Sequence, residues 1–256
     1  MSIRRFIKKV KNLHSQEGMN TSDLDLSVIN LIRDVPIEDL HDKSAIEKIL
    51  LSMGLNDEIS DEFPKELYPY SGFGLFSWQY PSQFSGLLLA ISKLDIKSYI
   101  EIGVRHGGTF IIISEYLKRL NPEFNKSIAV DLNESKSLRA YADSCSEVKF
   151  MIENSLTNKF RDFIQESEGF DLAFIDGDHS YEGARSDFET MRNQAKHIIF
   201  HDIVSVVCPG VCTMWQHVKA RYADEYDFYE FIDQYDEVVE RTGNTYLGIG
   251  LAVKKL

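Results

Sequence analysis

The chain has 256 residues, of which 43% are hydrophobic and 27% charged, a balance typical of a soluble globular protein. That length is enough for one large α/β domain with an extension. With 28 Lys and Arg against 40 Asp and Glu, the net charge of −12 would repel a polyanion, so we expect no nucleic-acid partner. No segment approaches the roughly 20 apolar residues that a membrane span needs.

The first part of the chain is predicted to form helices. Residues 1–13 carry five basic residues and have apolar residues at helical spacing, which indicates a basic amphipathic helix. We expect this helix to pack on its own domain or on a neighbouring subunit; weak contact with an anionic membrane surface is the alternative. Further helices are predicted at residues 24–34 and 43–53, the second ending at Gly54.

Residues 63–81 are rich in aromatic and turn-forming residues, which predicts a loop or lid. A helix is then predicted from Pro81 to residue 94, because proline is tolerated in the first turn of a helix. Six aromatic side chains before this helix are candidates either to line an acceptor site or to pack within the lid: Tyr68, Tyr70, Phe73, Phe76, Trp78 and Tyr80.

From residue 98 onward, short apolar strands alternate with helices. The strands are predicted at residues 99–102, 127–130, 148–152, 172–175, 198–200, 228–232 and 247–253, and the helices at residues 109–120, 160–166, 181–194 and 213–222. This alternation predicts a parallel sheet with both faces covered. The last two strands, with no helix predicted between them, are expected to form a terminal antiparallel hairpin. Ligands in such a sheet bind beyond the carboxyl ends of the strands.

The first predicted strand leads into a glycine-rich loop. Its glycines, Gly103, Gly107 and Gly108, match neither the dinucleotide pattern nor a P-loop. Asp131 ends the next strand, where a carboxylate can accept hydrogen bonds from two ribose hydroxyls. Glu101 can meet a cationic amino group. A ribose and an ammonium together suit S-adenosylmethionine (SAM).

A second group of polar residues follows two later strands. Asp176 and Asp202 end strands that should be neighbours, so their carboxylates should face one crevice and repel each other unless a cation or proton lies between them. Oxygen ligands with waters suit Mg²⁺. His179 and His201 accompany the two aspartates. The imidazole of His179 is suited to proton transfer near neutral pH.

The remaining polar and thiol residues have plainer interpretations. The three cysteines, an odd number in a long chain, indicate a reducing compartment rather than a disulfide framework. Cys208 and Cys212 lack a second pair at zinc-finger spacing and are interpreted as packing thiols. Asp178 and Asp187 are interpreted as solvated or helix-capping residues.

Several stretches resemble the class I SAM-dependent methyltransferases. Glu101-Ile102-Gly103 with Gly107 and Gly108 is similar to the first motif of that class, and Asp131 matches its ribose-binding acidic residue. Residues 170–179 (FDLAFIDGDH) and 199–203 (IFHDI) resemble a metal-dependent subgroup that includes macrolide-sugar O-methyltransferases and cephalosporin-hydroxylase-like proteins. Residues 78–81 (WQYP) and 209–215 are also similar to it, and the similarity extends over residues 76–256.

The resemblance implies a Rossmann-like α/β fold, with a mostly parallel seven-stranded sheet and a terminal antiparallel hairpin. Residues 1–75 would be an N-terminal helical extension with an aromatic lid, and residues 76–256 the methyltransferase domain. The cofactor would be SAM, and its expected binding residues are Glu101, Gly103, Gly107, Gly108, Thr109, Asp131 and Ser155.

The resemblance also implies a mechanism. Asp176 and Asp202 would be metal ligands, and His179 would be the general base that removes a proton from a metal-bound hydroxyl. His201, which stands where some relatives have glutamate, is a third candidate ligand; imidazole favours Mn²⁺, Fe²⁺ or Zn²⁺ more than Mg²⁺ does. We expect a cytoplasmic O-methyltransferase that uses Mg²⁺ or Mn²⁺ and methylates a sugar or another small polar natural product. The oligomeric state, a homo-oligomer included, is left open by the sequence.

Three other functions are weighed against this one. A metal-dependent hydrolase would use the aspartates and histidines to activate water, but it leaves the glycine loop and Asp131 without a purpose. A non-catalytic protein that keeps the fold would predict damaged motifs. A nicotinamide oxidoreductase is weakened by the glycine spacing.

Overall fold

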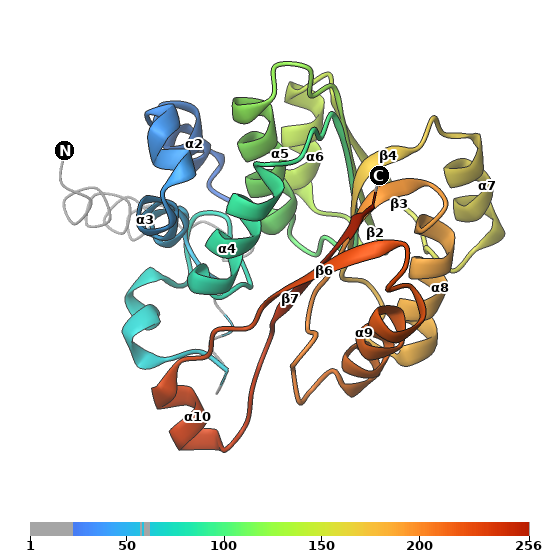
Figure 1. The fold of residues 1–256 in the computed structure, drawn as a ribbon. Helices are drawn as coiled ribbons and strands as arrows, with labels where there is room; N and C mark the ends of the chain where they lie inside the picture. The colour runs from blue at the N-terminus through green and yellow to red at the C-terminus, as the bar shows by residue number, and fades with distance from the viewer. Residues whose placement is uncertain (1–22, 57, 59–61, 256) are drawn as a thin grey trace.

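The computed structural model describes residues 23–56, 58 and 62–255. In these residues a central seven-stranded sheet lies between two groups of helices (Figure 1). The predicted basic helix at residues 1–13, with its membrane-contact alternative, lies outside the described residues. Within the part of the chain that is described, no helix has the length and apolar character needed to cross a membrane.

The sheet has the strand order β3-β2-β1-β4-β5-β7-β6. Its strands are β1 (Ser98–Ile102), β2 (Lys126–Asp131), β3 (Val148–Ile152), β4 (Phe170–Ile175), β5 (Ala195–Phe200), β6 (Tyr226–Phe231) and β7 (Ile249–Lys254). The first five strands run parallel, and β7 is antiparallel to both β5 and β6. The predicted mostly parallel sheet with a terminal antiparallel pair is therefore confirmed.

Both faces of the sheet are buried, as the apolar strand sequences predict. Successive side chains of a strand point to opposite faces, so Tyr99 packs in one apolar cluster and Ile100 in the other. The first cluster is covered by α4 (Pro81–Ile91), α5 (Gly108–Leu120) and α6 (Lys136–Ser144), and the second by α7 (Asn158–Glu166), α8 (Tyr181–Met191) and α9 (Pro209–Arg221) (Figure 1).

The chain before β1 adds a further layer outside α4 and α5. It contains η1 (Leu26–Ile29), α2 (Asn30–Arg33), η2 (Ile37–His41), α3 (Lys43–Met53) and η3 (Lys65–Tyr70). Arg33 forms a salt bridge with Glu115 of α5, which is only 1% exposed, and Tyr141 donates to the same carboxylate at 2.9 Å. A buried carboxylate is costly unless it is paired in this way. The domain boundary expected after residue 75 stays a prediction.

Local signals explain where the predictions held and failed. The helix predicted at residues 43–53 is α3, capped by Asp42 and ended by Gly54 at φ 90°. The single helix predicted at residues 24–34 is instead a 3₁₀ turn followed by one short α-helix. The prediction of no helix between the last two strands is wrong, because α10 (Asp236–Thr242) lies there. It has seven residues and buries only Val238, so its sequence carries no apolar stripe to detect.

The strand order places a ligand crevice at one edge of the sheet. From β1 the chain continues to β2 and β3 on one side, and then returns to β4 and β5 on the other. The loops after β1 and β4 therefore diverge at a topological switch point, where open α/β sheets bind ligands. Gly103 follows β1 and Asp176 follows β4, so the two predicted groups of functional residues meet at this point.

Candidate active site

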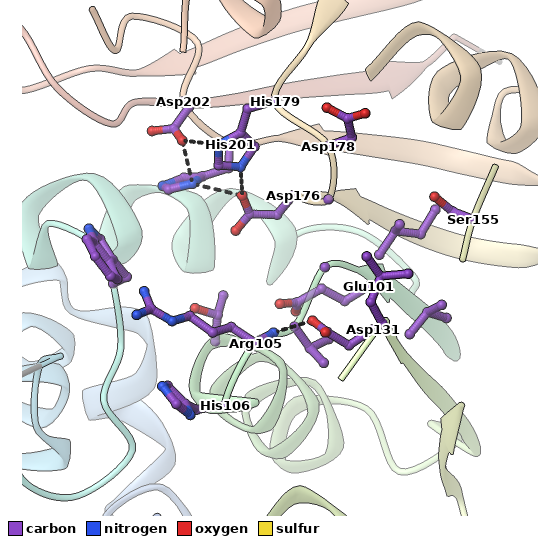
Figure 2. A pocket seen from close by; sticks show the side chains of 18 of the residues that line it. Glu101, Arg105, His106, Asp131, Ser155, Asp176, Asp178, His179, His201 and Asp202 are labelled. Atoms are coloured by element: carbon purple, nitrogen blue, oxygen red, sulfur yellow. Dashed lines mark hydrogen bonds and ion pairs between the residues drawn. The ribbon is translucent and has the colours of Figure 1, made fainter. Parts of the chain in front are cut away.

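One cavity of about 670 Å³ opens at the carboxyl edge of β1, β2, β4 and β5. Its size is that of a pocket for a small ligand. Figure 2 shows Glu101 and Asp131 on one side of it and Asp176, His179, His201 and Asp202 on the other. The two predicted groups of residues therefore line the same cavity.

The glycine loop after β1 has little room for side chains. Gly103 has φ 87°, and a Cβ atom on it would lie 2.0 Å from the carbonyl oxygen of Asp176. A Cβ on Gly108 would lie 1.9 Å from the carbonyl oxygen of Leu75. Only glycine fits such a conformation and such close approaches. The loop thereby presses against the loop after β4 and leaves its own backbone facing the cavity.

Asp131 lies at the end of β2 with its carboxylate held by backbone groups. The N–H of Arg105 donates to Oδ2 at 2.7 Å, and the N–H of Asn133 donates to Oδ1 at 2.9 Å. Each carboxylate oxygen has a second lone pair, so both can still accept a hydroxyl hydrogen. Ser155, which is 9% exposed, and Thr109 also line the cavity, as the sequence predicts.

Glu101 is 1% exposed and lines the floor of the cavity. The hydroxyl of Tyr99 donates to its carboxylate. Burial raises the pKa of Glu101 well above its ordinary value, and the negative charge of Asp176 adds to this effect. A cationic group in the cavity would offset both contributions and favour the ionised carboxylate.

The opposite end of the cavity holds two aspartates and two histidines in direct contact. His179 Nε2 lies 3.3 Å from Asp176 Oδ1, and His201 Nδ1 lies 3.1 Å from the same oxygen. Asp202 Oδ2 lies 3.6 Å from His179 Nδ1 and 3.5 Å from His201 Nδ1. Asp202 has φ 60°, a backbone conformation that side chains other than glycine seldom adopt. The four side chains, two from the loop after β4 and two from the loop after β5, thus converge on one point, as Figure 2 shows.

The charges at this end are strongly coupled. Burial raises the pKa of Asp176, but the charge of His201 and the hydrogen bond with His179 outweigh it and lower that pKa to about 2. The hydrogen bonds with Asp176 and Cys208 raise the pKa of His179 to about 11. Burial lowers the pKa of His201, yet the two aspartates raise it to about 9. Without a metal, the neighbouring aspartates therefore favour the protonated form of both imidazoles.

The residues fit a divalent cation. Asp176, His201 and Asp202 each offer a ligand atom, and these atoms lie within 4.8 Å of one another. His201 Nε2 and Asp202 Oδ1 are buried and have no hydrogen-bond partner among the described residues. Burying a polar atom without a partner costs free energy, so these two atoms indicate that a ligand or ion binds beside them. A cation would neutralise the carboxylates in place of the two imidazolium protons.

Cys208 packs in the second apolar cluster, as predicted, but its thiol also contacts the charged residues. Its Sγ lies 3.2 Å from His179 Nδ1 and donates to Asp202 Oδ2 at 3.1 Å. Burial raises the pKa of its thiol. Cys212, one turn further along α9, instead contacts the carbonyl oxygens of Asp202 and Ser205. The sequence signal for this difference was weak, since only the loop after β5 brings Cys208 back to the aspartates.

The six aromatic candidates separate into two groups. Phe76 and Trp78 line the cavity. The other four are not among its lining residues: Tyr68, Tyr70, Phe73 and Tyr80. Tyr80 is fully buried and packs edge-on against Phe63 with ring centroids 5.4 Å apart. The expected acceptor-lining role is therefore restricted to two of the six.

The structure adds Glu62 and Arg105 to the cavity wall. Trp78 Nε1 donates to Glu62 at 3.3 Å, and burial raises the pKa of this glutamate. The guanidinium of Arg105 lies 4.3 Å from the centroid of the Trp78 ring and forms a salt bridge of 2.6 Å with Glu58. These residues come from the N-terminal layer and the glycine loop, and no local pattern in the sequence connects them.

Asp178 and Asp187 also differ from each other. Asp178 is exposed, which fits the solvated interpretation, and it accepts a hydrogen bond from the backbone N–H of Ser180, the N-cap residue of α8. For Asp187 that interpretation is wrong. It lies inside α8 and is 0% exposed. Burial raises its pKa to about 6.

The sheet order, the glycine loop after β1 and the acidic residue after β2 are those of the Rossmann-like methyltransferase fold. Residues 100–203 match the model of a family described as a methyltransferase domain. This part of the chain is therefore similar to a methyltransferase domain, which agrees with the predicted class of enzyme. A comparison with curated proteins gives no significant match.

Solved structures of other methyltransferases have the same fold. The O-methyltransferase TomG from Streptomyces achromogenes, involved in tomaymycin synthesis and solved in complex with SAM, has a TM-score of 0.54 and 13% identity, with 100% of each chain covered. An O-methyltransferase from Bacillus cereus in complex with SAH has a TM-score of 0.52 and 14% identity, covering 99% of this chain and 100% of that one. At such identities the similarity concerns the fold.

Proposed function

We propose that this protein is a SAM-dependent O-methyltransferase that requires a divalent cation and methylates a hydroxyl of a small polar acceptor. The observation that carries the proposal is the single cavity, which joins the glycine loop and Asp131 at one end to the Asp176–His179–His201–Asp202 cluster at the other. Methyl transfer needs a donor and a nucleophile held in line, and one continuous cavity allows this.

The cofactor end has the groups that SAM needs. Asp131 can accept hydrogen bonds from the two ribose hydroxyls, because backbone N–H groups already hold its carboxylate in place. Glu101 is a buried carboxylate that favours a cationic partner such as the amino group of SAM. The proteins TomG and the Bacillus cereus enzyme were solved with SAM and SAH, which supports the same cofactor here.

The other end of the cavity has the groups that activate a hydroxyl. Asp176, His201 and Asp202 would hold a divalent cation, Mg²⁺ or Mn²⁺, which when bound would lower the pKa of an acceptor hydroxyl. His179 is within hydrogen-bonding distance of Asp176 and has its side chain 43% exposed. A neighbouring positive charge opposes protonation of an imidazole, so His179 in the loaded protein is free to accept the hydroxyl proton.

The acceptor is proposed to be a sugar or a similar polyhydroxylated natural product. Phe76 and Trp78 offer aromatic faces in the cavity, and Glu62 offers a carboxylate beside Trp78. Aromatic faces and nearby hydrogen-bond acceptors suit a flat, hydroxyl-rich ligand. The hydrolase alternative has no observation in its favour that the methyltransferase proposal lacks.

Calorimetry with SAM, SAH and NAD⁺ tests the cofactor assignment. SAM and SAH should bind and NAD⁺ should not. A panel of hydroxylated acceptors with radiolabelled SAM then tests the reaction, with and without a chelator. Binding of NAD⁺ in preference to SAM would overturn the cofactor, and label transfer at the full rate in chelator would overturn the cation requirement.

A further inference from the structure

Cys208 is the one thiol that faces the charged cluster, among the described residues. It is the N-cap residue of α9 and is 5% exposed, so the first turn of this helix carries the thiol into the cavity wall. Its Sγ touches Asp202 Oδ2 and His179 Nδ1 at 3.1 Å and 3.2 Å. Thiol, imidazole and carboxylate thus come together from two loops, the one before α8 and the one before α9.

The three ligand atoms have the spacing of atoms around one metal ion. His179 Nδ1 and Asp202 Oδ2 are 3.6 Å apart, and Cys208 Sγ lies 3.1–3.2 Å from each. Ligand atoms around a tetrahedral zinc ion, at about 2.0–2.3 Å from the metal, lie about 3.3–3.7 Å from one another. Shifts of a few tenths of an ångström would therefore suffice to complete one triangular face of such a site.

We propose that His179, Asp202 and Cys208 form a binding site for a thiophilic divalent cation, with Zn²⁺ as its ligand. Thiolate and imidazole together select zinc and cobalt over magnesium, which prefers oxygen ligands. Binding would exchange the thiol proton of Cys208 and the imidazolium proton of His179 for the metal, and both protons pass to solvent. His179 is the most exposed of the three, which leaves the fourth coordination position open to the cavity.

A second observation points to a bound cation. Asp202 and His201 are 4% and 5% exposed, and Asp202 Oδ1 and His201 Nε2 have no hydrogen-bond partner among the described residues. Oδ2 of Asp202 already faces the thiol and the imidazole, so Oδ1 remains for a further electropositive partner. The carboxylate of Asp202 is therefore common to this site and to the Asp176–His201–Asp202 set.

The sharing of residues has a consequence for catalysis, and this consequence rests on the proposed function. Zn²⁺ on Nδ1 of His179 would withdraw this imidazole from its role as a base. It would also compete for Asp202 with the cation of the oxygen-rich set. We therefore expect Zn²⁺ to inhibit methyl transfer that is supported by Mg²⁺, and Cys208 to be required for the inhibition.

Cobalt spectroscopy tests the site without any catalytic assay. Chelator-treated full-length protein is titrated with Co²⁺, and a thiolate-to-cobalt charge-transfer band in the near ultraviolet is expected, to be bleached by Zn²⁺. Cys208→Ser should lose the band and bind Zn²⁺ at least about tenfold more weakly. Cys212→Ser is the matched control, because Cys212 lies one turn away and contacts only backbone oxygens of the cluster region.

The outcomes are distinct. No band in the unaltered protein, a band that persists in Cys208→Ser, or equal loss in Cys212→Ser would overturn the proposal. If Cys208→Ser does not fold, zinc X-ray absorption on the unaltered protein replaces it, and a sulfur neighbour at about 2.3 Å is expected. Neither measurement contains SAM or an acceptor, so failure of the methyl-transfer assay leaves this result unchanged, and the reverse also holds.

Discussion

The two ends of the cavity hold their functional groups by different means. At the cofactor end, glycine conformation and backbone N–H groups set the geometry, as for Gly103 and the carboxylate of Asp131. At the acceptor end, ionisable side chains hold one another, and the pKa of Asp176 and that of His179 depend on each other's charge. SAM binding at the cofactor end should therefore be insensitive to cations, whereas the geometry and charge of the acceptor end should depend on them.

Removal of the cation should have the largest effect on methyl transfer. It should also separate the two ends experimentally, because SAM binding at the cofactor end should be unchanged. Chelation, or the variant Asp202→Asn, should abolish methyl transfer, because the carboxylate that links the cation ligands is lost. SAM affinity measured by calorimetry should stay the same. Asp227→Asn, on the exposed surface of β6, is the control. Equal loss of SAM binding and of transfer would show that the ends are not independent.

Loss of the proposed general base, His179, should have the second largest effect on the rate of methyl transfer. His179→Ala should slow turnover by about 10²–10⁴-fold, the usual contribution of a general base, while SAM still binds. His217→Ala serves as the control, since His217 is also exposed and contacts Tyr181 outside the cavity. Single-turnover rates with labelled SAM measure the step. A rate within a few-fold of the unaltered protein would remove His179 from the chemistry.

A pH-dependent stability effect is expected from Asp187, which is buried inside α8 and is not one of the residues that line the cavity. Burial raises its pKa from 3.8 to about 6, so the folded state binds more protons than the unfolded state. Its contribution to stability is therefore complete below about pH 4 and is lost as the pH rises through about 6. At about 1.4 kcal/mol per pKa unit, the loss is about 3 kcal/mol.

Urea unfolding of the unaltered protein and of Asp187→Asn between about pH 4 and pH 7 measures this effect. The stability of the variant relative to that of the unaltered protein should increase steadily as the pH rises, because an amide has no proton to lose. Stability curves that stay parallel over the whole range would show that the carboxylate keeps its ordinary ionisation.

The smallest effect is expected at the cofactor end. Asp131→Ala should weaken SAM binding by about 1–3 kcal/mol, because two charge-assisted hydrogen bonds to the ribose are lost. Cobalt binding at the acceptor end should be unaffected. Asp143→Ala, an exposed carboxylate on α6, is the control in titration calorimetry. Unchanged affinity for SAM in Asp131→Ala would remove this residue from the cofactor site.

Sequence reasoning succeeded where the signal is local. Apolar runs and helical periodicity predicted the strand and helix succession, and glycine spacing predicted the loop after β1. The acidic residues at strand ends needed only the rule that parallel strands end at one edge. Short or weakly apolar elements were missed, such as α6 and α10, because their patterns bury few residues.

By itself, the sequence determined the parallel sheet, the glycine loop and the placement of Asp131, Asp176 and Asp202 at one edge, because each depends on neighbours in the chain. Only the tertiary structure decided that Cys208 touches His179, that Asp187 is buried, and that Trp78 lines the cavity. These facts depend on how separate loops and helices pack, and no spacing along the chain encodes the distance between them.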